Sequence, residues 1–403
     1  MLFEQTTLGD VSKGGKGNYG IAASAVDYSD ELYTYLRITD IKDDGTIDFE
    51  GLKSVNDGKA ANYLLQPNDI VFARTGASTG RNYFYDGSDG QFVYAGFLIK
   101  FSIDPDKVNP KYVKYYCLSQ EYKGWIASYN TGSTRGNINA QTLAQMPLLL
   151  PERMQQDKMV DILSSIDRKI KENEKINKNL LQQLDTLYDE FSHRENWSVV
   201  TIDDIAEKVA MGPFGSNIKV STFVSDGIPI ISGNHLRGYF LEEPSFNYIT
   251  EEHAQRLKNS LVYPKDIVFT HAGNIGQVAM IPDDCHYPMY VLSQRQFYLR
   301  CNTEKAIPEY VVLFFHSKQG QHELLSYANQ TGVPSIAQPA TNLKKIPLKL
   351  PPIDEQRQWL QLVSPIIKLY QSNVYENEHL SNMRDSLLPE LMSGELDVSD
   401  LDI

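Results

Sequence analysis

Polar side chains of the kinds that could contact nucleic acid lie in short loops of this sequence, many of them next to glycine. Arg, Asn and Gln carry paired donors and acceptors that match base edges, while Lys, Ser and Thr can bind phosphate oxygens. The candidates of the first half are Lys13, Lys16, Asn18, Arg74, Thr75, Ser78, Arg81, Ser133, Arg135 and Asn137. Those of the second half are Phe214, Ser216, Asn217, Lys219, Asn234, His235, Arg237, His271, Asn274, Gln294, Arg295 and Gln296. For each residue taken singly, an exposed loop position or a structural hydrogen bond is expected at least as often as a DNA contact.

The sequence contains no recognisable motif of a catalytic centre. An adenine methyltransferase needs an Asn/Asp-Pro-Pro-aromatic tetrapeptide, and Leu350-Pro351-Pro352-Ile353 has the prolines without the amide. A GxxxxGK(S/T) phosphate loop is absent as well. The three cysteines stand singly, which indicates neither a disulfide framework nor a zinc site. We therefore expect a non-catalytic chain with no cofactor and no metal.

The formal net charge of −13 argues at first against nucleic acid, because binding phosphates normally requires a basic surface. More than half of this negative charge lies in the last segment, however: the net charge is −3 for residues 1–150, −2 for 151–195, −1 for 196–350 and −7 for 351–403. Both large segments are therefore free to carry a locally basic face. The start of the sequence lacks a secretory signal, and no apolar run approaches the roughly 20 residues of a membrane helix. We expect a cytoplasmic protein without membrane contact.

The two halves of the chain repeat the same signatures in the same order. Gln66-Pro67-Asn68-Asp69-Ile70-Val71-Phe72 recurs as Tyr263-Pro264-Lys265-Asp266-Ile267-Val268-Phe269, so that Asp266 lies 197 residues after Asp69. Met146-Pro147-Leu148-Leu149-Leu150-Pro151 recurs 200 residues later as Ile346-Pro347-Leu348-Lys349-Leu350-Pro351. The offset of 200 continues into the segments that follow, matching Asn173 with Asn373 and Leu180 with Leu380, and a register held over this span predicts an internal duplication.

Each repeat is predicted to be a β-rich domain with a few short helices. Apolar β-type runs at 70–73, 92–101, 267–270 and 296–300 predict strands. Residues 110–129 and 308–328 predict short helices, and a Pro-bounded apolar run ends each repeat. The expected organisation is a target-binding domain at 1–150, a spacer helix at 151–195, a second domain at 196–350, and a second spacer helix with the C-terminal tail at 351–403.

The segments that follow the two domains predict long helices. Residues 152–195 contain neither Gly nor Pro, and their apolar residues recur close to every 3.5 positions. A helix of about 44 residues would span roughly 66 Å. Pro365 should kink or interrupt the second helix, since proline removes a backbone donor. The apolar face of each helix is too long for one domain to cover, so we expect the two helices to pair as an antiparallel coiled coil. The expected fold is α+β, with two β-rich domains in pseudo-twofold arrangement that are separated by these helices.

This layout resembles the specificity (S) subunit of type I restriction-modification enzymes, and several motifs carry the resemblance over nearly the whole chain. They are Leu8-Gly9-Asp10-Val11, Ile202-Asp203-Asp204-Ile205, the loop Gly212-Pro213-Phe214-Gly215-Ser216, the paired Asp-Ile-Val-Phe strands, Leu350-Pro351-Pro352-Ile353-Asp354-Glu355-Gln356, and the closing segment 386–396. The first repeat departs from the pattern. It has Lys13-Gly14-Gly15-Lys16-Gly17-Asn18-Tyr19 in place of the Gly-Pro-Phe-Gly-Ser loop, and its helix begins with Leu150-Pro151-Glu152-Arg153.

The resemblance implies two target-recognition domains that read an asymmetric bipartite site in double-stranded DNA. It also implies helices that dock two methyltransferase (M) subunits, joined by restriction and translocase (R) subunits. Two alternatives stay open. A two-headed protein-interaction scaffold has the same layout and would bind no DNA, and a stand-alone nuclease or methyltransferase with diverged motifs would be active by itself.

Overall fold

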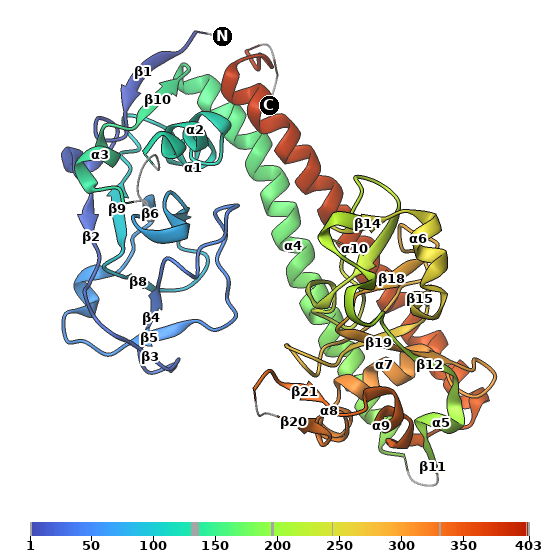
Figure 1. Cartoon of the computed structure of the whole chain (residues 1–403). Coiled ribbons are helices and arrows are strands. Elements are labelled where there is room, and N and C mark those ends of the chain that lie inside the picture. Colours follow the sequence, from blue (N-terminus) through green and yellow to red (C-terminus); the bar gives the residue numbers. More distant parts are fainter. Residues whose placement is uncertain are drawn as a thin grey trace. The chain divides into compact units, whose positions relative to one another are not determined.

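The computed structural model describes residues 2–129, 137–194, 197–243, 245–329, 332–399 and 401. The chain divides into two compact units, one formed by residues 1–173 and 375–403 and the other by residues 174–374. Each unit combines one β-rich half with parts of two long helices, α4 (Arg153–Ser192) and α10 (Ile353–Ser393). The predicted α+β class is confirmed, with two β-rich halves joined by long helices that pack together (Figure 1). Within the described ranges, no helix combines the length and apolar character that crossing a bilayer requires.

The β-rich half of the first unit contains two four-stranded sheets and a two-stranded ribbon. The sheet orders are β2-β9-β6-β7 and β3-β5-β4-β8, and the ribbon pairs β1 with β10. The elements are β1 (Glu4–Thr7), β2 (Asn18–Tyr19), β3 (Ala25–Val26), β4 (Tyr33–Leu36), β5 (Lys53–Val55), β6 (Asp69–Ala73), β7 (Asn82–Tyr85), β8 (Phe92–Tyr94), β9 (Leu98–Ser102), α1 (Pro110–Tyr116), α2 (Gln120–Tyr129), α3 (Ala140–Ala144) and β10 (Pro147–Leu150).

The second half repeats the central sheet, the closing ribbon and three strands of the other sheet, whose fourth strand lies at the opposite edge, β3 beside β5 in the first half and β15 beside β18 in the second. Its sheets have the orders β12-β19-β16-β17 and β14-β13-β18-β15, and β11 pairs with β22. The elements are β11 (Ser198–Thr201), α5 (Ile202–Ile205), β12 (Ala206–Met211), β13 (Ile228–Ile231), β14 (Asn247–Ile249), α6 (Glu251–Arg256), β15 (Leu261–Val262), β16 (Ile267–Thr270), β17 (Val278–Met280), β18 (Tyr290–Leu292), β19 (Gln296–Cys301), α7 (Pro308–His316), α8 (Lys318–Leu325), β20 (Ala328–Asn329), β21 (Ser335–Ile336), α9 (Pro339–Lys345) and β22 (Pro347–Leu350).

Strand pairing shows that the two halves share one design. The strand that carries the repeated Asp-Ile-Val-Phe motif is central in both: β6 lies between β9 and β7, and β16 lies between β19 and β17. The second sheet of each half contains one parallel pair, β4 with β8 and β13 with β18. The closing ribbons also agree in register, with Thr7 opposite Pro147 and Thr201 opposite Pro347. The internal duplication predicted from the sequence is therefore present in the fold.

The turn before each central strand explains the conservation of the Pro-x-Asp signature between the halves. Asn68 and Lys265 occupy the same place after a proline, and both have a left-handed backbone, with φ of 73° and 71°. The following aspartate is buried and accepts a hydrogen bond from the amide three residues before it, Asp69 from Gln66 and Asp266 from Tyr263. A cation from the neighbouring strand neutralises each carboxylate: Lys100 lies 3.0 Å from Asp69, and Arg300 lies 2.6 Å from Asp266.

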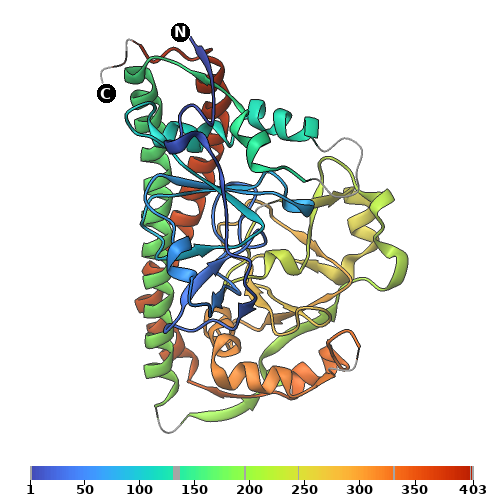
Figure 2. The same cartoon turned by 90° about the vertical axis from the view of Figure 1, so that its left-hand side faces the viewer.

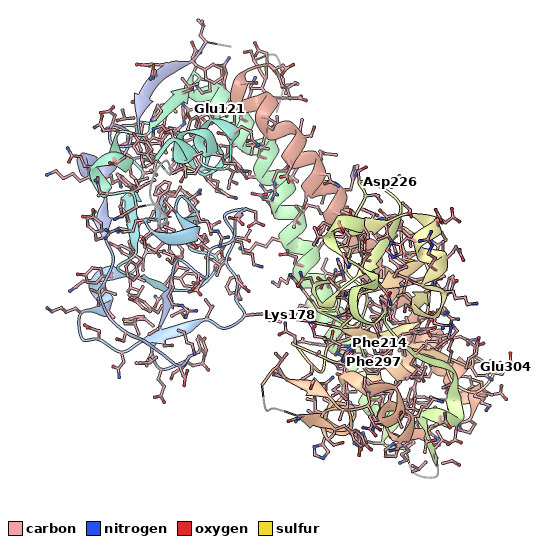
Figure 3. The ribbon with its side chains drawn as sticks, in the orientation of Figure 1. Glu121, Lys178, Phe214, Asp226, Phe297 and Glu304 are labelled. Carbon is pink, nitrogen blue, oxygen red and sulfur yellow. The ribbon has the colours of Figure 1, made fainter. Side chains whose placement is uncertain are left out.

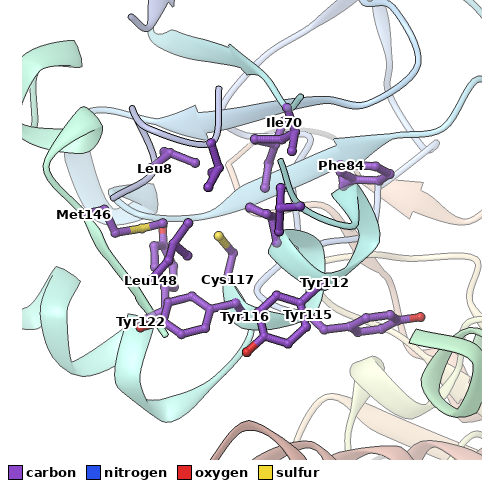
Figure 4. Packing of buried hydrophobic residues seen from close by; sticks show 14 of the residues in the cluster. Leu8, Ile70, Phe84, Tyr112, Tyr115, Tyr116, Cys117, Tyr122, Met146 and Leu148 are labelled. Carbon is purple, nitrogen blue, oxygen red and sulfur yellow. The ribbon is translucent and has the colours of Figure 1, made fainter. Parts of the chain in front are cut away.

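Each unit has a large apolar core between its central sheet, its short helices and the long helices. In the first unit Leu8, Ile70, Tyr112 and Leu148 belong to this core (Figure 4), which also includes residues from the start of α4 and the end of α10. Met392 of α10 is 2% exposed. Leu391, beside it, is fully buried. The second unit repeats the arrangement with the end of α4 and the start of α10. Burial of both helices in both cores means that neither helix depends on its intrinsic propensity alone.

Opposite ends of α4 and α10 pack against each other in each unit, so the two helices run antiparallel (Figure 2). In the second unit Phe191 of α4 stacks on Trp359 of α10 with ring centroids 5.5 Å apart and an interplanar angle of 9°. Helix α10 continues through Pro365, contrary to the expectation that this proline interrupts it. Val363 and Ile367, on either side, are buried in the core, and this packing compensates for the lost backbone hydrogen bond.

Candidate nucleic-acid interface

A corner of the first half, where β6 and β9 meet, brings together several of the residues predicted from the sequence. The amide of Arg74, just after β6, donates to the carbonyl of Phe97, just before β9, at 3.0 Å. Thr75 forms an isolated bridge with Asn137, so two segments that are distant in sequence meet there. Phe97 is 60% exposed and Asn137 is also exposed. The corner therefore presents an aromatic ring and polar groups to solvent, with the half-buried Arg74 beside them.

The equivalent corner of the second half uses the same backbone contacts with different side chains. The amide of His271, just after β16, donates to the carbonyl of Arg295, just before β19, at 2.9 Å. Ala272 bridges Ser335, as Thr75 bridges Asn137. Arg295 is exposed, and its guanidinium lies close to Gly273, since Nη1 would be 3.4 Å from a Cβ placed on that glycine. The two corners thus share one backbone frame and differ in the side chains that they carry.

A close backbone crossing beside each corner requires glycine. A Cβ on Gly212 would lie 2.1 Å from the carbonyl oxygen of Ser293, and a Cβ on Gly20 would lie 2.2 Å from that of Ala95. Gly20 and Gly212 are therefore equivalent, and the first-half counterpart of the Gly-Pro-Phe-Gly-Ser loop begins at Gly20. This corrects the alignment that placed Lys13 to Tyr19 there. The cause is the short 3-10 helix Lys13–Gly15, which precedes β2 and has no counterpart in the continuous strand β12.

The loop that follows Gly212 is held in place by the neighbouring turn. Gln294 donates from Nε2 to the carbonyl oxygens of Gly215 and Ile218, at 2.8 and 3.0 Å. Phe214 is 73% exposed on this loop, whereas Phe297, on β19, is fully buried (Figure 3). An exposed aromatic ring on a loop that is fixed by side-chain hydrogen bonds is suited to contact with a ligand.

Beyond this loop, a polar hollow of about 710 Å³ opens beside α6 in the second half. Asn217 and Lys219, both predicted from the sequence, line it together with His253 and Arg256. His253 contacts the carbonyl oxygen of Asn217 through Nε2 at 2.7 Å. Glu252 also lines the hollow and forms an ion pair with Arg256, so Lys219 is the basic side chain there that could contact an anionic backbone.

Three of the predicted residues are engaged in structural contacts. Arg81 holds Asp43 with both Nε and Nη2, at 2.7 and 3.0 Å, and reaches the carbonyl of Ile41. His235 is buried, accepts from the amide of Ser232, contacts the carbonyl of Ser245 through Nε2 and stacks on Phe246. Burial lowers the pKa of His235 below its ordinary value.

Gln296 is the third of these residues. It is 2% exposed, and its Oε1 accepts from Ser293 at 2.7 Å. His271 is an intermediate case, because its ring contacts the carbonyl of Gln294 at 3.1 Å and burial lowers its pKa.

The remaining predicted residues lie at several places. Exposed positions hold Lys13, Lys16, Asn18, Asn234, Arg237 and Asn274, and Ser78 is half-buried. Ser133, Arg135 and the side chain of Ser216 lie outside the described part of the structure. Within the described part, no group of three or more His, Cys, Asp or Glu side chains could hold a metal ion.

The comparison with protein families decides what this duplicated arrangement is. The family model described as the type I restriction modification DNA specificity domain matches the chain twice, over residues 2–182 and 194–380.

The chain belongs to this family.

It is thus a specificity subunit of a type I restriction-modification system, the non-catalytic component that recognises the DNA target sequence, as its resemblance to that family implied.

Individual relatives agree with the family assignment. The MjaIX specificity subunit of a type I restriction enzyme from Methanocaldococcus jannaschii is 23% identical over 328 residues, which cover 74% of this chain and 72% of the relative. The MjaVIII specificity subunit of the same organism is 21% identical and covers 84% and 81%. Among solved structures, the S subunit of a type I system from M. genitalium aligns over 96% of both chains with a TM-score of 0.54 and 14% identity, which shows a shared fold.

Three residues of the specificity subunit's corners were missed by sequence reasoning. Tyr19 and Phe97 are exposed aromatic residues at the first corner, and Gly20 is required by its backbone crossing. The side-chain hydroxyl of Tyr19 accepts from the amide of Ala140 at 3.2 Å. A search restricted to polar loop residues could not find the aromatic pair, whereas an alignment of the halves that allowed a gap before Tyr19 would have found Gly20.

Proposed function

We propose that this specificity subunit reads an asymmetric, bipartite site in double-stranded DNA, with one β-rich half on each half-site. Residues 1–150 and 196–350 would be the two target-recognition domains, and residues 151–195 and 351–403 would supply the helices and tail that connect them and dock partners. We place its action in the cytoplasm, where bacterial and archaeal DNA lies.

The proposal rests on one observation: the two corners have the same backbone contacts but carry different side chains. Arg74 and Phe97 in the first half take the positions of His271 and Arg295 in the second. Asn137 takes the position of Ser335. Two copies of one fold would approach DNA in the same way, whereas different side chains at matched positions would select different bases. An asymmetric target is the expected result.

The helices support a role in docking two methyltransferase subunits, which restriction and translocase subunits would then join. Several apolar side chains on the helices face solvent, among them Ile176 at 42%, Leu362 at 66% and Leu369 at 48% exposure. The net charge of −7 over residues 351–403 disfavours contact with phosphate and favours a protein surface. Exposed apolar residues on a rigid helix suit a protein interface.

The competing function is a two-headed scaffold that binds proteins and no DNA. The corner residues favour the DNA reader, because the Arg and Asn side chains carry paired donors and acceptors that match base edges. Supplying the methyltransferase partner separates the two functions. A DNA complex should then form with the reader and should not form with the scaffold.

Methylome sequencing of cells with and without the gene tests the proposal. We expect one bipartite motif, with two dissimilar half-sites separated by a fixed gap, to carry adenine methylation only when the gene is present. A methylome that is identical in both strains would contradict the proposed function.

A further inference from the structure

The arginines of the β-rich halves differ in whether the protein itself uses their guanidinium groups. Arg37, Arg81 and Arg300 form ion pairs with Asp40, Asp43 and Asp266, respectively, at 2.6 to 2.7 Å. No hydrogen bond or ion pair of the Arg74 or Arg295 side chain occurs within the described ranges. Arg74 even has a buried Nε with no partner. A donor left in this state costs free energy without contributing to the fold, which calls for a functional reason.

Arg237, which is exposed, lacks such a partner in the described ranges as well, but Arg74 and Arg295 are the two that occupy the ends of one cross-strand contact. In the first half the amide-to-carbonyl bond joins Arg74 to Phe97, and in the second half the same bond joins His271 to Arg295. In the first half the arginine directly follows β6, the strand that ends at the corner, whereas in the second half it directly precedes β19, the strand that begins there. Among the described residues, each corner carries one arginine, on opposite sides of the strand pair.

The guanidinium of Arg74 is held in place by an aromatic ring, and the backbone at Arg295 is held in place by a closed turn. The guanidinium of Arg74 lies 5.0 Å over the ring of Tyr19, whose hydroxyl is fixed by the amide of Ala140. Arg295 lies in a turn that is closed by a hydrogen bond from the amide of Gln296 to the carbonyl of Ser293 at 3.3 Å. The preceding residue, Gln294, donates hydrogen bonds to two loop carbonyls. A preorganised side chain loses less conformational entropy on binding.

We infer that Arg74 and Arg295 are the guanine-reading residues of the two half-sites. This inference rests on the proposed function and names its chemistry. A planar guanidinium can donate two parallel hydrogen bonds to O6 and N7 of guanine in the major groove, and this pair is the commonest specific contact between proteins and DNA. Each half-site then contains one guanine whose N7 is required. The displacement of the arginine across the corner places that guanine differently in the two half-sites.

Guanine with N7 replaced by carbon, 7-deazaguanine, isolates this contact because pairing with cytosine is preserved. The probe is the methylated motif identified from the methylome, made as duplexes with one 7-deazaguanine at each guanine in turn. The protein is the assembled complex of this chain with its methyltransferase subunits. For the wild type we expect about 10- to 100-fold weaker binding for one substitution in each half-site.

Variants assign each sensitive guanine to its arginine. Arg74→Gln should make binding indifferent to 7-deazaguanine at one position in one half-site while the other half-site stays sensitive, and Arg295→Gln should do the reverse. The half-site that stays sensitive shows that each variant is folded and assembled. Arg74→Lys keeps the charge but not the two parallel donors, so its discrimination at this position should fall between wild type and Arg74→Gln. Arg81→Gln, a change at a structurally paired arginine, should leave both guanines sensitive.

Two results would overturn the inference. One is a wild-type complex that tolerates 7-deazaguanine everywhere in the motif. The other is a sensitive guanine that stays sensitive in both glutamine variants. This includes the case in which both variants weaken binding to all duplexes by the same factor, which is the result expected when a phosphate contact is lost. Either result leaves the proposed function standing, provided that methylation of the motif depends on the gene. A methylome that does not depend on the gene contradicts the proposed function instead.

Discussion

Asn173 donates a hydrogen bond from Nδ2 to Oδ1 of Asn377 at 2.9 Å, which joins α4 to α10 within the first unit. Asn373 makes the matching contact in the second unit, where its Nδ2 donates to Oδ1 of Asn177 at 2.8 Å. The donors lie 200 residues apart in sequence, as do the acceptors, so the same pair has been kept in both copies of the duplicated module. Buried amides in a helix pair oppose other registers, because a shift would leave them buried without a hydrogen-bond partner.

Replacing one partner of this amide pair should destabilise the helix pair. Asn177→Ala removes the acceptor of Asn373, which is 7% exposed, and leaves a buried donor without a partner. We expect the free energy of unfolding to fall by about 1 to 3 kcal/mol, measured by chemical denaturation. Asn179→Ala on the exposed side of the same helix is the matched control and should change stability by less than about 0.5 kcal/mol. Equal losses in both variants would show that the amide pair has no special role.

Adding a methyl group at the backbone crossing should damage one half-site. In Gly212→Ala the new Cβ would meet the carbonyl oxygen of Ser293, a backbone atom that cannot rotate away. The crossing must therefore open, at a cost of about 1 to 3 kcal/mol, and the loop that carries Phe214 shifts with it. We expect a lower melting temperature and a lower methylated fraction of the motif.

The control for this change is another glycine with space around it. A Cβ on Gly124, within helix α2, would have no heavy atom within 4 Å other than its neighbours. Gly124→Ala should keep full methylation and should raise stability slightly, because alanine favours the helix. Full methylation in Gly212→Ala would contradict the assignment of this crossing to the recognition surface.

Mild acid should weaken the second half selectively. Burial lowers the pKa of His235 and of His316 below the ordinary value of 6.5, and both contact backbone carbonyls through Nε2. The unfolded chain therefore binds protons near pH 6.5 that the folded chain does not, so the stability from these groups is present above this pH and is lost as the pH falls. Residues 1–150 contain no histidine.

Hydrogen exchange at pH 7.5 and 5.5, corrected for the intrinsic rates, measures this difference. Protection of β13 and α7 should fall at the lower pH, while that of β6 and β9 should stay nearly constant. Equal loss of protection in both halves would indicate that these histidines do not control the acid response.

Much of the fold could be predicted because it is encoded by local patterns. The recurring Pro-x-Asp signature identified the central strands β6 and β16, and the uninterrupted apolar periodicity of residues 152–195 identified α4. The corner where β6 and β9 meet could not be predicted from the sequence. Residues 92–101 read as one apolar run, yet the chain turns within it and forms β8 and β9, with Phe97 exposed at the turn.

Individual site residues were less predictable, because partners distant in sequence decide what a polar side chain does. Arg74 and Arg81 look alike in the sequence, each in a polar loop after β6. Asp43, which lies 38 residues before Arg81, forms an ion pair with its guanidinium, whereas the guanidinium of Arg74 lies over the ring of Tyr19. Only the fold brings these pairs together. The equivalence of Gly20 with Gly212 was likewise hidden by the extra residues around the 3-10 helix Lys13–Gly15.

The central claim is that one duplicated module reads each half-site, and a chimeric chain tests it most directly. Residues 198–350 would be replaced by residues 4–150, exchanging the segments bounded by the equivalent ribbons β11-β22 and β1-β10. Because the helices run antiparallel, methylome sequencing of cells that carry only the chimera should reveal an inverted repeat of the half-site read by the first module. An assembled chimera that still methylates the original asymmetric motif, or a motif unrelated to it, would contradict the account.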